Sequence, residues 1–456
     1  MMQIMTPRNT RTAQELDEMR QLVHHVSTGD YTLETTLVPK PRAPLALLQR
    51  VKEGIERIHY NRRVHNSMRV TPSIVCVVPT YERETDIDKT IESLLLQTRQ
   101  LDRIVVVVNG PGTRDTAYQR AIPYANAFPC VEVVQLDPEM AGKVNALNWA
   151  YRQHVIAGEF DFMLGVDADV VCDSEMVEKL EIDIIENPDA AGVKARYGFE
   201  LPDRITCRGR GVIYGQRHEF AMTEVKQQLR GCRTEILGGQ STIFRVSALQ
   251  EAAKTTRGSN PWNPQSKVED AELTRTVQRN GYTTLTSRHA RAWTGLMEHP
   301  YEWHKQRRKW QDGHLEDMTR DFRPIQDARR WMQQMVLGWN VLIRVMFVTL
   351  MMSGVLLDRY VFSPIWLVPI GLSILQSVLI AIKLPNRSFG EVVRSLLFLP
   401  GEIYYLRTLS VWIESVLSLF ANIRKDGWKR QYAAEAGRKR AAVSGWIVLT
   451  LSVLVP

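Results

Sequence analysis

The sequence predicts an α/β protein built on a parallel sheet and followed by apolar helices long enough to enter a membrane. Between residues 73 and 169, β-branched strand patterns alternate with helical patterns, as is typical of strands joined by crossover helices. Towards the C-terminus the composition changes to nearly uncharged apolar segments. The chain has 456 residues and is 44% hydrophobic, so it is long enough for two or three units and a sizeable core.

Four segments carry the strand pattern and end in turn-forming residues: SIVCVVPTY (73–81), RIVVVVNG (103–110), VEVVQL (131–136) and FDFMLGVDAD (160–169). The segments TDIDKTIESLLLQT (85–98) and AGKVNALNWAYRQHV (141–155) are predicted to be helices between them. Ligands of such sheets gather at the carboxyl ends of the strands. We therefore expect the tails PTYE, NGPG and DAD to form one binding edge.

Three apolar segments stand in the C-terminal third, at 341–357, 361–382 and 441–456. A spanning helix needs about 20 such residues. The second segment is long enough, the first needs Met335 to Trp339 and includes Arg344, and the third falls just short. Flanking basic clusters favour membrane spans over buried core helices. Residues 388–430 hold charges in mid-segment, which predicts helices lying in the membrane interface.

The net charge of +8 is compatible with nucleic acid, an anionic membrane surface or an anionic substrate. Its basic runs, QRRK, RKDGWKR and GRKR, border apolar segments, which favours lipid headgroups and argues against nucleic acid. The five cysteines are odd in number and form no CxxC pair, which argues against a disulfide framework or zinc site and for a reducing compartment. The N-terminus has no apolar secretory signal.

Two aspartates interrupt the apolar run FMLGVDADVVCD, which spans residues 162–173. If residues 166–170 are extended, Asp167 and Asp169 point to one side and repel each other unless a cation lies between them. Mn²⁺ or Mg²⁺ prefers such oxygen ligands. A calcium loop is excluded because Val171 and Cys172 occupy its fifth and sixth positions. An exposed turn without a metal is the alternative.

Lys143 stands at the predicted start of a helix, where a lysine suits a diphosphate, although the residue taken alone is better explained as a plain surface lysine. The first strand ends in VVPTYE, so Tyr81 either stacks on a base or covers the sheet. His299 and His304 lack partner ligands at suitable spacing and are predicted to be surface or interface histidines.

The motifs together resemble family 2 glycosyltransferases with C-terminal membrane helices, such as cellulose, chitin and hyaluronan synthases. The motifs that carry the resemblance, over about residues 73–320, are VVPTYERETDIDKTIESLLLQT, GKVNALN, VDADV, GGQSTIFR, VEDAELT and QRRKW. The resemblance implies a GT-A (Rossmann-like) fold, a nucleotide-sugar donor and an inverting transfer. A nucleotidyltransferase is the enzymatic alternative, but no glycine-rich phosphate loop follows the first strand. The non-enzymatic alternative is a basic membrane scaffold.

Carried over by position, the resemblance assigns Asp270 as general base and Asp169, with Asp167, as the metal site. The segment EDAELTRTVQRNGY (269–282) is predicted to be a helix closed by Gly281, so Asp270 is alternatively a helix-start residue. The resemblance assigns nucleotide binding to Pro79, Thr80, Tyr81, Glu82, Asn109, Lys143 and Asp167. The residues that it places at the acceptor and the diphosphate are Gly238, Gly239, Gln240, Glu269, Gln306, Arg307, Arg308 and Trp310. Trp310 is alternatively an interfacial anchor.

Three positions depart from the family pattern. Val268 replaces the usual threonine before the Glu-Asp pair, and Asn109 replaces an acidic residue after the second strand. Lys309 stands where the last motif has arginine, and lysine lacks the planar fork that binds phosphate bidentately. Nucleobase contact and processive polymerisation are therefore less assured.

The resulting expectation is a helical extension over 1–70, a GT-A domain over 71–330 and a membrane region over 331–456 with about three spanning helices and interfacial helices. The partners expected are a nucleotide sugar, UDP-linked in the first instance, the lipid bilayer, and a lipid, glycan or protein acceptor. We expect a multi-pass protein of the cytoplasmic membrane whose catalytic domain faces the cytosol. The sugar, linkage and homo-oligomer formation stay open.

Overall fold

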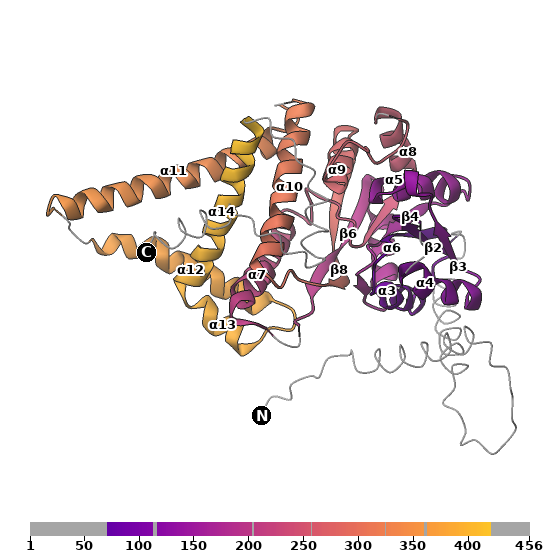
Figure 1. Cartoon of the computed structure of the whole chain (residues 1–456), viewed down its shortest axis with the longest axis horizontal. Coiled ribbons are helices and arrows are strands. Elements are labelled where there is room, and N and C mark those ends of the chain that lie inside the picture. The colour runs from indigo at the N-terminus through magenta and orange to yellow at the C-terminus, as the bar shows by residue number, and fades with distance from the viewer. Residues whose placement is uncertain are drawn as a thin grey trace, which may run out of the picture. The chain divides into compact units, whose positions relative to one another are not determined.

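The computed structural model describes residues 71–420, except 113–115, 203–204, 257, 324 and 360–362 (Figure 1). These residues form two compact units, which are described separately. The first comprises residues 71–200, 227–264 and 269–295, and the second comprises 201–226, 265–268 and 296–420. The predicted extension over 1–70 and the third apolar segment, 441–456, lie outside the described residues. The domain boundaries at 70 and 330 stay predictions.

An eight-stranded sheet in the described part of the first unit has the order β3-β2-β1-β4-β7-β6-β8-β5. Its strands are β1 (Ile74–Tyr81), β2 (Arg103–Asn109), β3 (Val131–Gln135), β4 (Phe162–Gly165), β5 (Val171–Cys172), β6 (Ala190–Phe199), β7 (Thr242–Arg245) and β8 (Thr283–Thr294). The four strands from β3 to β4 are parallel, as predicted. Beyond β4, where the sequence predicted no strands, the sheet is mixed, because β7 runs antiparallel to both β4 and β6.

Both faces of the sheet are covered, which explains why β1 and β2 are apolar without alternation. Ile74, Cys76 and Val78 enter one core, and Val75 and Val77 enter the other. The first core holds α3 (Ile87–Leu95), α4 (Thr116–Ala127) and α6 (Met176–Glu186). The second holds α5 (Lys143–Ala150), its π-helical continuation η2 (Tyr151–Ile156), α8 (Val246–Thr255) and α9 (Glu269–Arg279), as Figure 1 shows. A short 3-10 turn, η1 (Pro138–Met140), precedes α5.

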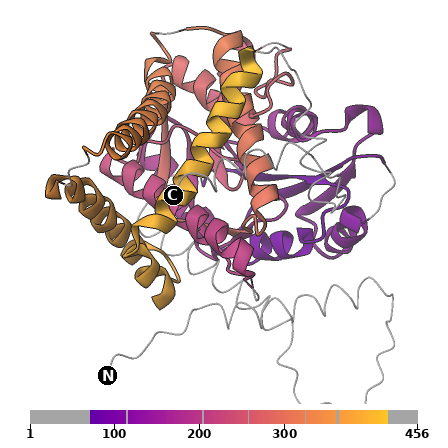
Figure 2. The ribbon, with the colours of Figure 1, turned by 60° about the vertical axis from the view of Figure 1, so that its left-hand side comes forward.

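The second unit is helical (Figure 2). Its helices are α7 (Cys207–Leu229), α10 (Pro300–Arg320), α11 (Ala328–Leu356), η3 (Pro364–Trp366), α12 (Leu367–Lys383), α13 (Phe389–Ser395) and α14 (Phe398–Phe420). Helix α10 packs against α14, where the Trp303 indole donates a hydrogen bond to the Tyr404 hydroxyl at 3.0 Å. A buried ion pair of 2.6 Å between Arg217 and Glu391 joins α7 to α13.

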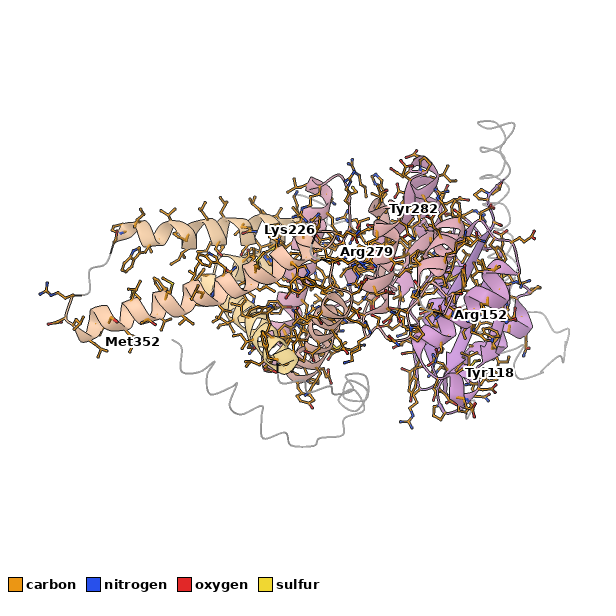
Figure 3. All side chains as sticks on the ribbon, turned by 90° about the horizontal axis from the view of Figure 1, so that it is seen from above. Tyr118, Arg152, Lys226, Arg279, Tyr282 and Met352 are labelled. Carbon is orange, nitrogen blue, oxygen red and sulfur yellow. The ribbon has the colours of Figure 1, made fainter. Side chains whose placement is uncertain are left out.

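Two described helices are long and apolar enough to cross a membrane, Ala328–Leu356 and Pro364–Lys383. They correspond to the first two predicted spans. Large apolar side chains are exposed along both, as Figure 3 shows for α11 near Met352, which is 56% exposed. The core helix of a soluble protein would bury such a surface. By length, composition and exposure these helices therefore favour the membrane interpretation.

The charged residue within the first predicted span, Arg344, has an ion-pair partner. Arg344 of α11 forms an ion pair with Glu402 of α14 at 2.7 Å, and its guanidinium lies 4.8 Å from the centroid of the Tyr405 ring. A charged side chain in hydrocarbon is tolerated when it is paired within the helix bundle. The mid-segment charges Arg344 and Glu402 therefore satisfy each other.

Candidate active site

The predicted binding edge forms at the carboxyl ends of three parallel strands. Thr80 and Tyr81 end β1, Asn109 ends the neighbouring β2, and Asp167 follows β4 by two residues. Lys143 is the first residue of α5, which confirms its predicted place at a helix N-terminus. The described edge thus gathers the polar tails that the strand pattern predicted.

The predicted extended conformation of residues 166–170 is wrong. Strand β4 ends at Gly165, and a turn follows in which the Val170 N–H donates to the Asp167 carbonyl at 3.3 Å. The hydroxyl of Thr90, from α3, fixes this turn by donating to the Ala168 carbonyl at 2.7 Å. Asp167 and Asp169 are therefore brought together by a turn and not by strand alternation.

Asp169 lies in an environment with an excess of negative charge. Its pKa is raised to about 6, first by burial and then by repulsion from the carboxylates of Asp167 and Glu84. The hydroxyl of Thr294, at the end of β8, donates to its Oδ2 at 3.3 Å. Sequence reasoning missed Glu84, although its position in YERET, directly after the first strand, was the available signal.

Lys143 is surrounded by three of the predicted carboxylates. Its Nζ lies 2.8 Å from Asp167, 3.2 Å from Glu269 and 3.8 Å from Asp270. Burial by itself lowers the pKa of Lys143, but the three carboxylates outweigh it and hold that pKa well above its usual value. We call Lys143, Asp167, Glu269 and Asp270 the carboxylate cluster. It joins residues from α5, the turn after β4 and the start of α9.

Asp270 occupies the first turn of α9, which Gly281 closes with a φ of +93°, as the sequence predicted. Its Oδ2 accepts a hydrogen bond from the Gly239 N–H at 2.7 Å. Burial raises the pKa of Asp270, Lys143 lowers it, and Glu269 and Asp167 raise it again, to about 7. A carboxyl group that titrates near neutral pH suits a general base.

The glycines of GGQST leave room for the carboxylate cluster. A Cβ at Gly239 would lie 2.7 Å from the Lys143 Nζ and 2.9 Å from the Asp167 Oδ1. A Cβ at Gly238 would lie 2.5 Å from the hydroxyl of Tyr197, a residue of β6 that sequence reasoning missed. Burial raises the pKa of Tyr197, and the charges of Asp270 and Asp167 add to this effect. Tyr197 therefore borders the cluster, and no sequence signal pointed to it.

The predicted nucleotide residues at the ends of β1 and β2 hold the local backbone. Asn109 donates to the Thr80 carbonyl at 2.7 Å and accepts from the Gly142 N–H at 3.1 Å. Glu82 is buried and accepts from the Gly112 N–H at 3.1 Å. Pro79 is buried within β1. Both polar side chains thus shape the edge, and direct contact of any of these residues with a nucleotide stays a prediction.

The QRRKW motif lies in α10 of the second unit. Arg307 forms an ion pair with Glu219 of α7 at 2.9 Å, and its guanidinium lies 4.5 Å from the centroid of the Trp310 ring. Arg308 pairs with Asp312 at 2.9 Å and also with Glu414. Both arginines therefore have partners within this unit. The predicted roles of Gln306, Arg307, Arg308 and Trp310 at the acceptor and diphosphate, and that of Gln240, stay predictions.

No group of three or more His, Cys, Asp or Glu side chains in residues 71–420, as described, is arranged to hold a metal ion. The residues still fit a divalent cation that takes part of its shell from elsewhere. Asp167 and Asp169 are oxygen donors, and the repulsion at Asp169 is relieved by a positive charge. Mg²⁺ and Mn²⁺ commonly complete their shells with water and phosphate.

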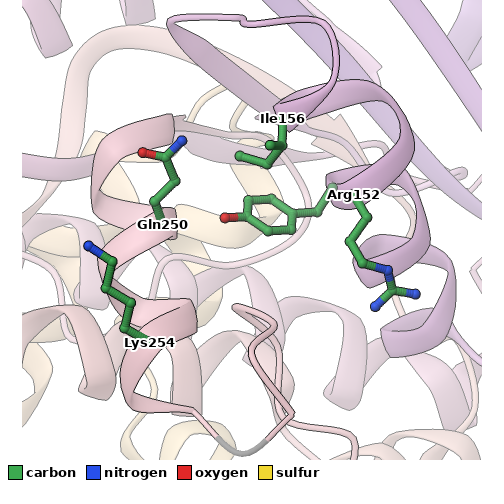
Figure 4. Close-up of a pocket in the computed structure, with 5 residues that line it drawn as sticks. Arg152, Ile156, Gln250 and Lys254 are labelled. Atoms are coloured by element: carbon green, nitrogen blue, oxygen red, sulfur yellow. The ribbon is translucent and has the colours of Figure 1, made fainter.

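A pocket elsewhere in the first unit is a separate feature. It measures about 390 Å³ and is lined by Tyr151, Arg152, Ile156, Gln250 and Lys254, from η2 and α8 (Figure 4). None of the predicted site residues lines it. The chemistry of the chain is therefore sought at the carboxylate cluster.

Comparison with known proteins shows what the chain is similar to. Residues 75–252 match the model of glycosyl transferase family 2. The poly-beta-1,6-N-acetyl-D-glucosamine synthase of Staphylococcus aureus (strain COL) is 20% identical over 281 residues, 60% of this chain and 64% of the relative. The same synthase from strain N315 matches equally. The chain thus spans less than two thirds of the length of these relatives.

Among solved structures, the chain is similar to the mannosyltransferase PcManGT from Pyrobaculum calidifontis in complex with GDP-Man and Mn²⁺. The similarity covers 83% of this chain and 98% of that chain, with 14% identity and a TM-score of 0.47.

The family match and the order of the sheet together support the predicted GT-A fold for this part of the chain. The match over residues 75–252 agrees with the resemblance to family 2 glycosyltransferases that the motifs had predicted.

Proposed function

We propose that the protein transfers a sugar, with inversion, from a nucleotide-sugar donor to a hydroxyl group of an acceptor at the membrane. The carboxylate cluster carries this proposal. It places Asp270 within reach of Lys143 and next to the Gly239 backbone N–H, two residues that lie in the segment matching family 2. The relatives are named as synthases of an N-acetylglucosamine polymer, so UDP-N-acetylglucosamine is the first donor to test.

Asp270 acts as the general base in this proposal. An acceptor hydroxyl is a weak nucleophile until its proton is removed during attack. Asp270 accepts that proton while the acceptor oxygen bonds to the anomeric carbon and the bond to the diphosphate breaks on the opposite face. The Gly239 N–H, which donates to Oδ2, keeps the carboxylate oriented. A pKa of about 7 leaves a substantial fraction of Asp270 ionised at neutral pH.

Lys143 stabilises the departing diphosphate. The leaving group accumulates negative charge, and fixed positive charge near it lowers the barrier. The raised pKa of Lys143 keeps this side chain protonated over the working pH range. A divalent cation held by Asp169 and Asp167 would supply further Lewis-acid stabilisation of the same charge.

The metal assignment predicts that Asp169→Asn weakens Mn²⁺ binding on the order of tenfold or more, since ligand charge sets affinity. The measurement is the electron paramagnetic resonance signal of free Mn²⁺ titrated with the full-length protein. Asp173→Asn is the matched control, because Asp173 lies nearby but accepts a hydrogen bond from the Trp293 indole at 2.7 Å. Equal Mn²⁺ affinity of the two variants would contradict the assignment.

The membrane part of the proposal uses α11 and α12 as spanning helices and α10 as the helix that precedes them. We propose that Trp310 receives the acceptor, with its indole face against a sugar ring, and that Gln306 and the adjacent arginines support the diphosphate. The exposed apolar surfaces of α11 and α12 support residence in a bilayer. A multi-pass arrangement with a cytosolic catalytic domain belongs to this proposal.

The direct test is a panel of labelled nucleotide sugars given to membranes that contain the protein, with and without EDTA. We expect sugar to be transferred to a membrane or glycan fraction from one donor, with UDP-N-acetylglucosamine and GDP-mannose as the first two arms. EDTA should abolish transfer, and added Mn²⁺ should restore it. Full transfer in excess EDTA would contradict metal dependence, and failure with every donor would contradict the proposed activity.

A further inference from the structure

The four residues before the catalytic pair belong to the second unit and are bound to α10. In chain order, Gln265 to Val268 stand directly before Glu269 and Asp270. Arg320 of α10 donates to the Gln265 carbonyl at 2.8 Å, and Lys267 pairs with Glu316 at 2.7 Å. Ser266 and Val268 make the buried contacts. Each residue of the segment is thus in contact with α10.

The contact of Ser266 with Asp317 is buried. The Ser266 hydroxyl donates to the Asp317 Oδ2 at 2.6 Å and accepts from the Val268 N–H at 3.1 Å. Ser266 is 7% exposed and Asp317 is 4% exposed. Asp317 also pairs with Arg320 one turn later in the helix. Loss of the hydroxyl would leave a buried N–H and one carboxylate oxygen without this partner, which is costly away from water.

Gly313 allows α10 to approach the same segment closely. A Cβ at Gly313 would lie 2.8 Å and 3.1 Å from the two methyl carbons of Val268 and 3.3 Å from the Lys267 Cβ. Val268 is β-branched and 9% exposed, so its side chain has little freedom to move aside. The segment is therefore held by a hydrogen bond on one side and by close packing on the other.

We propose that Ser266, Val268, Gly313 and Asp317 form a positioning clamp that fixes the placement of Asp270 from α10. The inference rests on the proposed function, in which Asp270 is the base. Only Glu269 separates Val268 from Asp270, and consecutive Cα atoms are held about 3.8 Å apart, so the chain leaves little room for Asp270 to move independently of Val268. A shift of about 1 Å in a reacting group can cost about 10²-fold in rate.

The clamp also connects the base with the membrane helices along the chain. Helix α10 ends at Arg320, and residues 321–327 lead to α11, the first candidate span. In this proposal the clamp ties the segment directly before Asp270 to α10. The rate of sugar transfer would then depend on the state of the helices of the second unit, for example on whether they lie in a bilayer or have an acceptor bound.

The experiment compares variants of the full-length protein in membranes. Ser266→Ala and Gly313→Ala disturb the clamp, and Ser266→Thr keeps the hydroxyl. Lys267→Ala is the matched control, because it removes a partly exposed ion pair from the same segment, and such pairs contribute little. We measure kcat with the donor found in the panel, UDP-N-acetylglucosamine being the first probe, together with the donor Kd and the thermal unfolding of each variant.

We expect Ser266→Ala and Gly313→Ala to lower kcat about tenfold or more, since they misplace the base without removing it. Donor Kd should stay unchanged, and Ser266→Thr and Lys267→Ala should keep the activity of the parent protein. The clamp is overturned if both disturbing variants turn over like Lys267→Ala. It is also overturned if kcat falls only in proportion to donor binding or folded protein, because that pattern indicates a purely structural role.

Asp270→Asn, measured alongside, separates the two proposals. If Asp270→Asn is inactive while Ser266→Ala and Gly313→Ala work normally, only the clamp fails. If Asp270→Asn transfers sugar at the rate of the parent protein, Asp270 is not the base, and both the proposed mechanism and the clamp are wrong. Loss of kcat in Asp270→Asn and in both clamp variants, with donor Kd retained, supports both.

Discussion

Asp270→Asn is expected to lower kcat by about 10²–10⁴-fold, the range that a general base contributes. The amide keeps the shape of the carboxyl group and can still accept the hydrogen bond that the Gly239 N–H donates. It cannot take a proton from the acceptor hydroxyl. Donor binding should survive, because the nucleotide edge at β1 and β2 is unchanged. The measurement is single-turnover transfer together with equilibrium binding of the nucleotide sugar.

The pH dependence tests the same assignment. In the proposed mechanism Asp270 acts when it is ionised, and its pKa is raised to about 7, so kcat/KM should rise with pH through about 7 and then level off. Glu272→Gln, two residues further along α9, is the control and should keep both rate and profile. A loss of only a few-fold in Asp270→Asn, with the rise near pH 7 retained, would show that another residue takes the proton.

Gly239→Ala is expected to reduce transfer by about 10²-fold, although no reacting group is removed. The added Cβ would lie 2.7 Å from the Lys143 Nζ, 2.9 Å from the Asp167 Oδ1 and 3.0 Å from the Asp270 Oδ2. These atoms are the ends of side chains that can rotate, so the fold should persist while the carboxylate cluster is displaced. The test measures transfer and thermal unfolding on the same preparation.

Gly295→Ala is the matched control for this substitution. A Cβ at Gly295 meets no atom within 4 Å, so the same change from glycine to alanine is made there without a steric conflict. We expect Gly295→Ala to transfer sugar like the parent protein. Normal transfer by Gly239→Ala would show that the close approach of the backbone to the cluster has no part in catalysis.

The elements that local pattern specifies were predictable from the sequence. Continuous β-branched runs identified β1 and β2, and the polar residues after them correctly placed Thr80 and Asn109 at strand ends. The first-turn position of Asp270 followed from the helical pattern closed by Gly281. These features depend on neighbours in the chain, which the sequence displays directly.

Features that depend on distant contacts were not predictable. The turn at Ala168 is fixed by Thr90, 78 residues earlier, so an apolar run around Asp167 gave no sign of it. Tyr197 borders the cluster only because β6 pairs with β7 and β8. The antiparallel insertion of β7 likewise follows from sheet assembly, since its four residues read as an ordinary short strand.

The ion pair between Arg344 and Glu402 has a consequence for the biosynthesis of the protein. The two residues are 58 positions apart, so α11 leaves the ribosome before the carboxylate that neutralises its guanidinium has been synthesised. A helix entering the bilayer with an uncompensated arginine is inserted at a penalty. In the proposed membrane arrangement, stable integration of α11 is therefore expected to be delayed until α14 has emerged, because only then can the ion pair form.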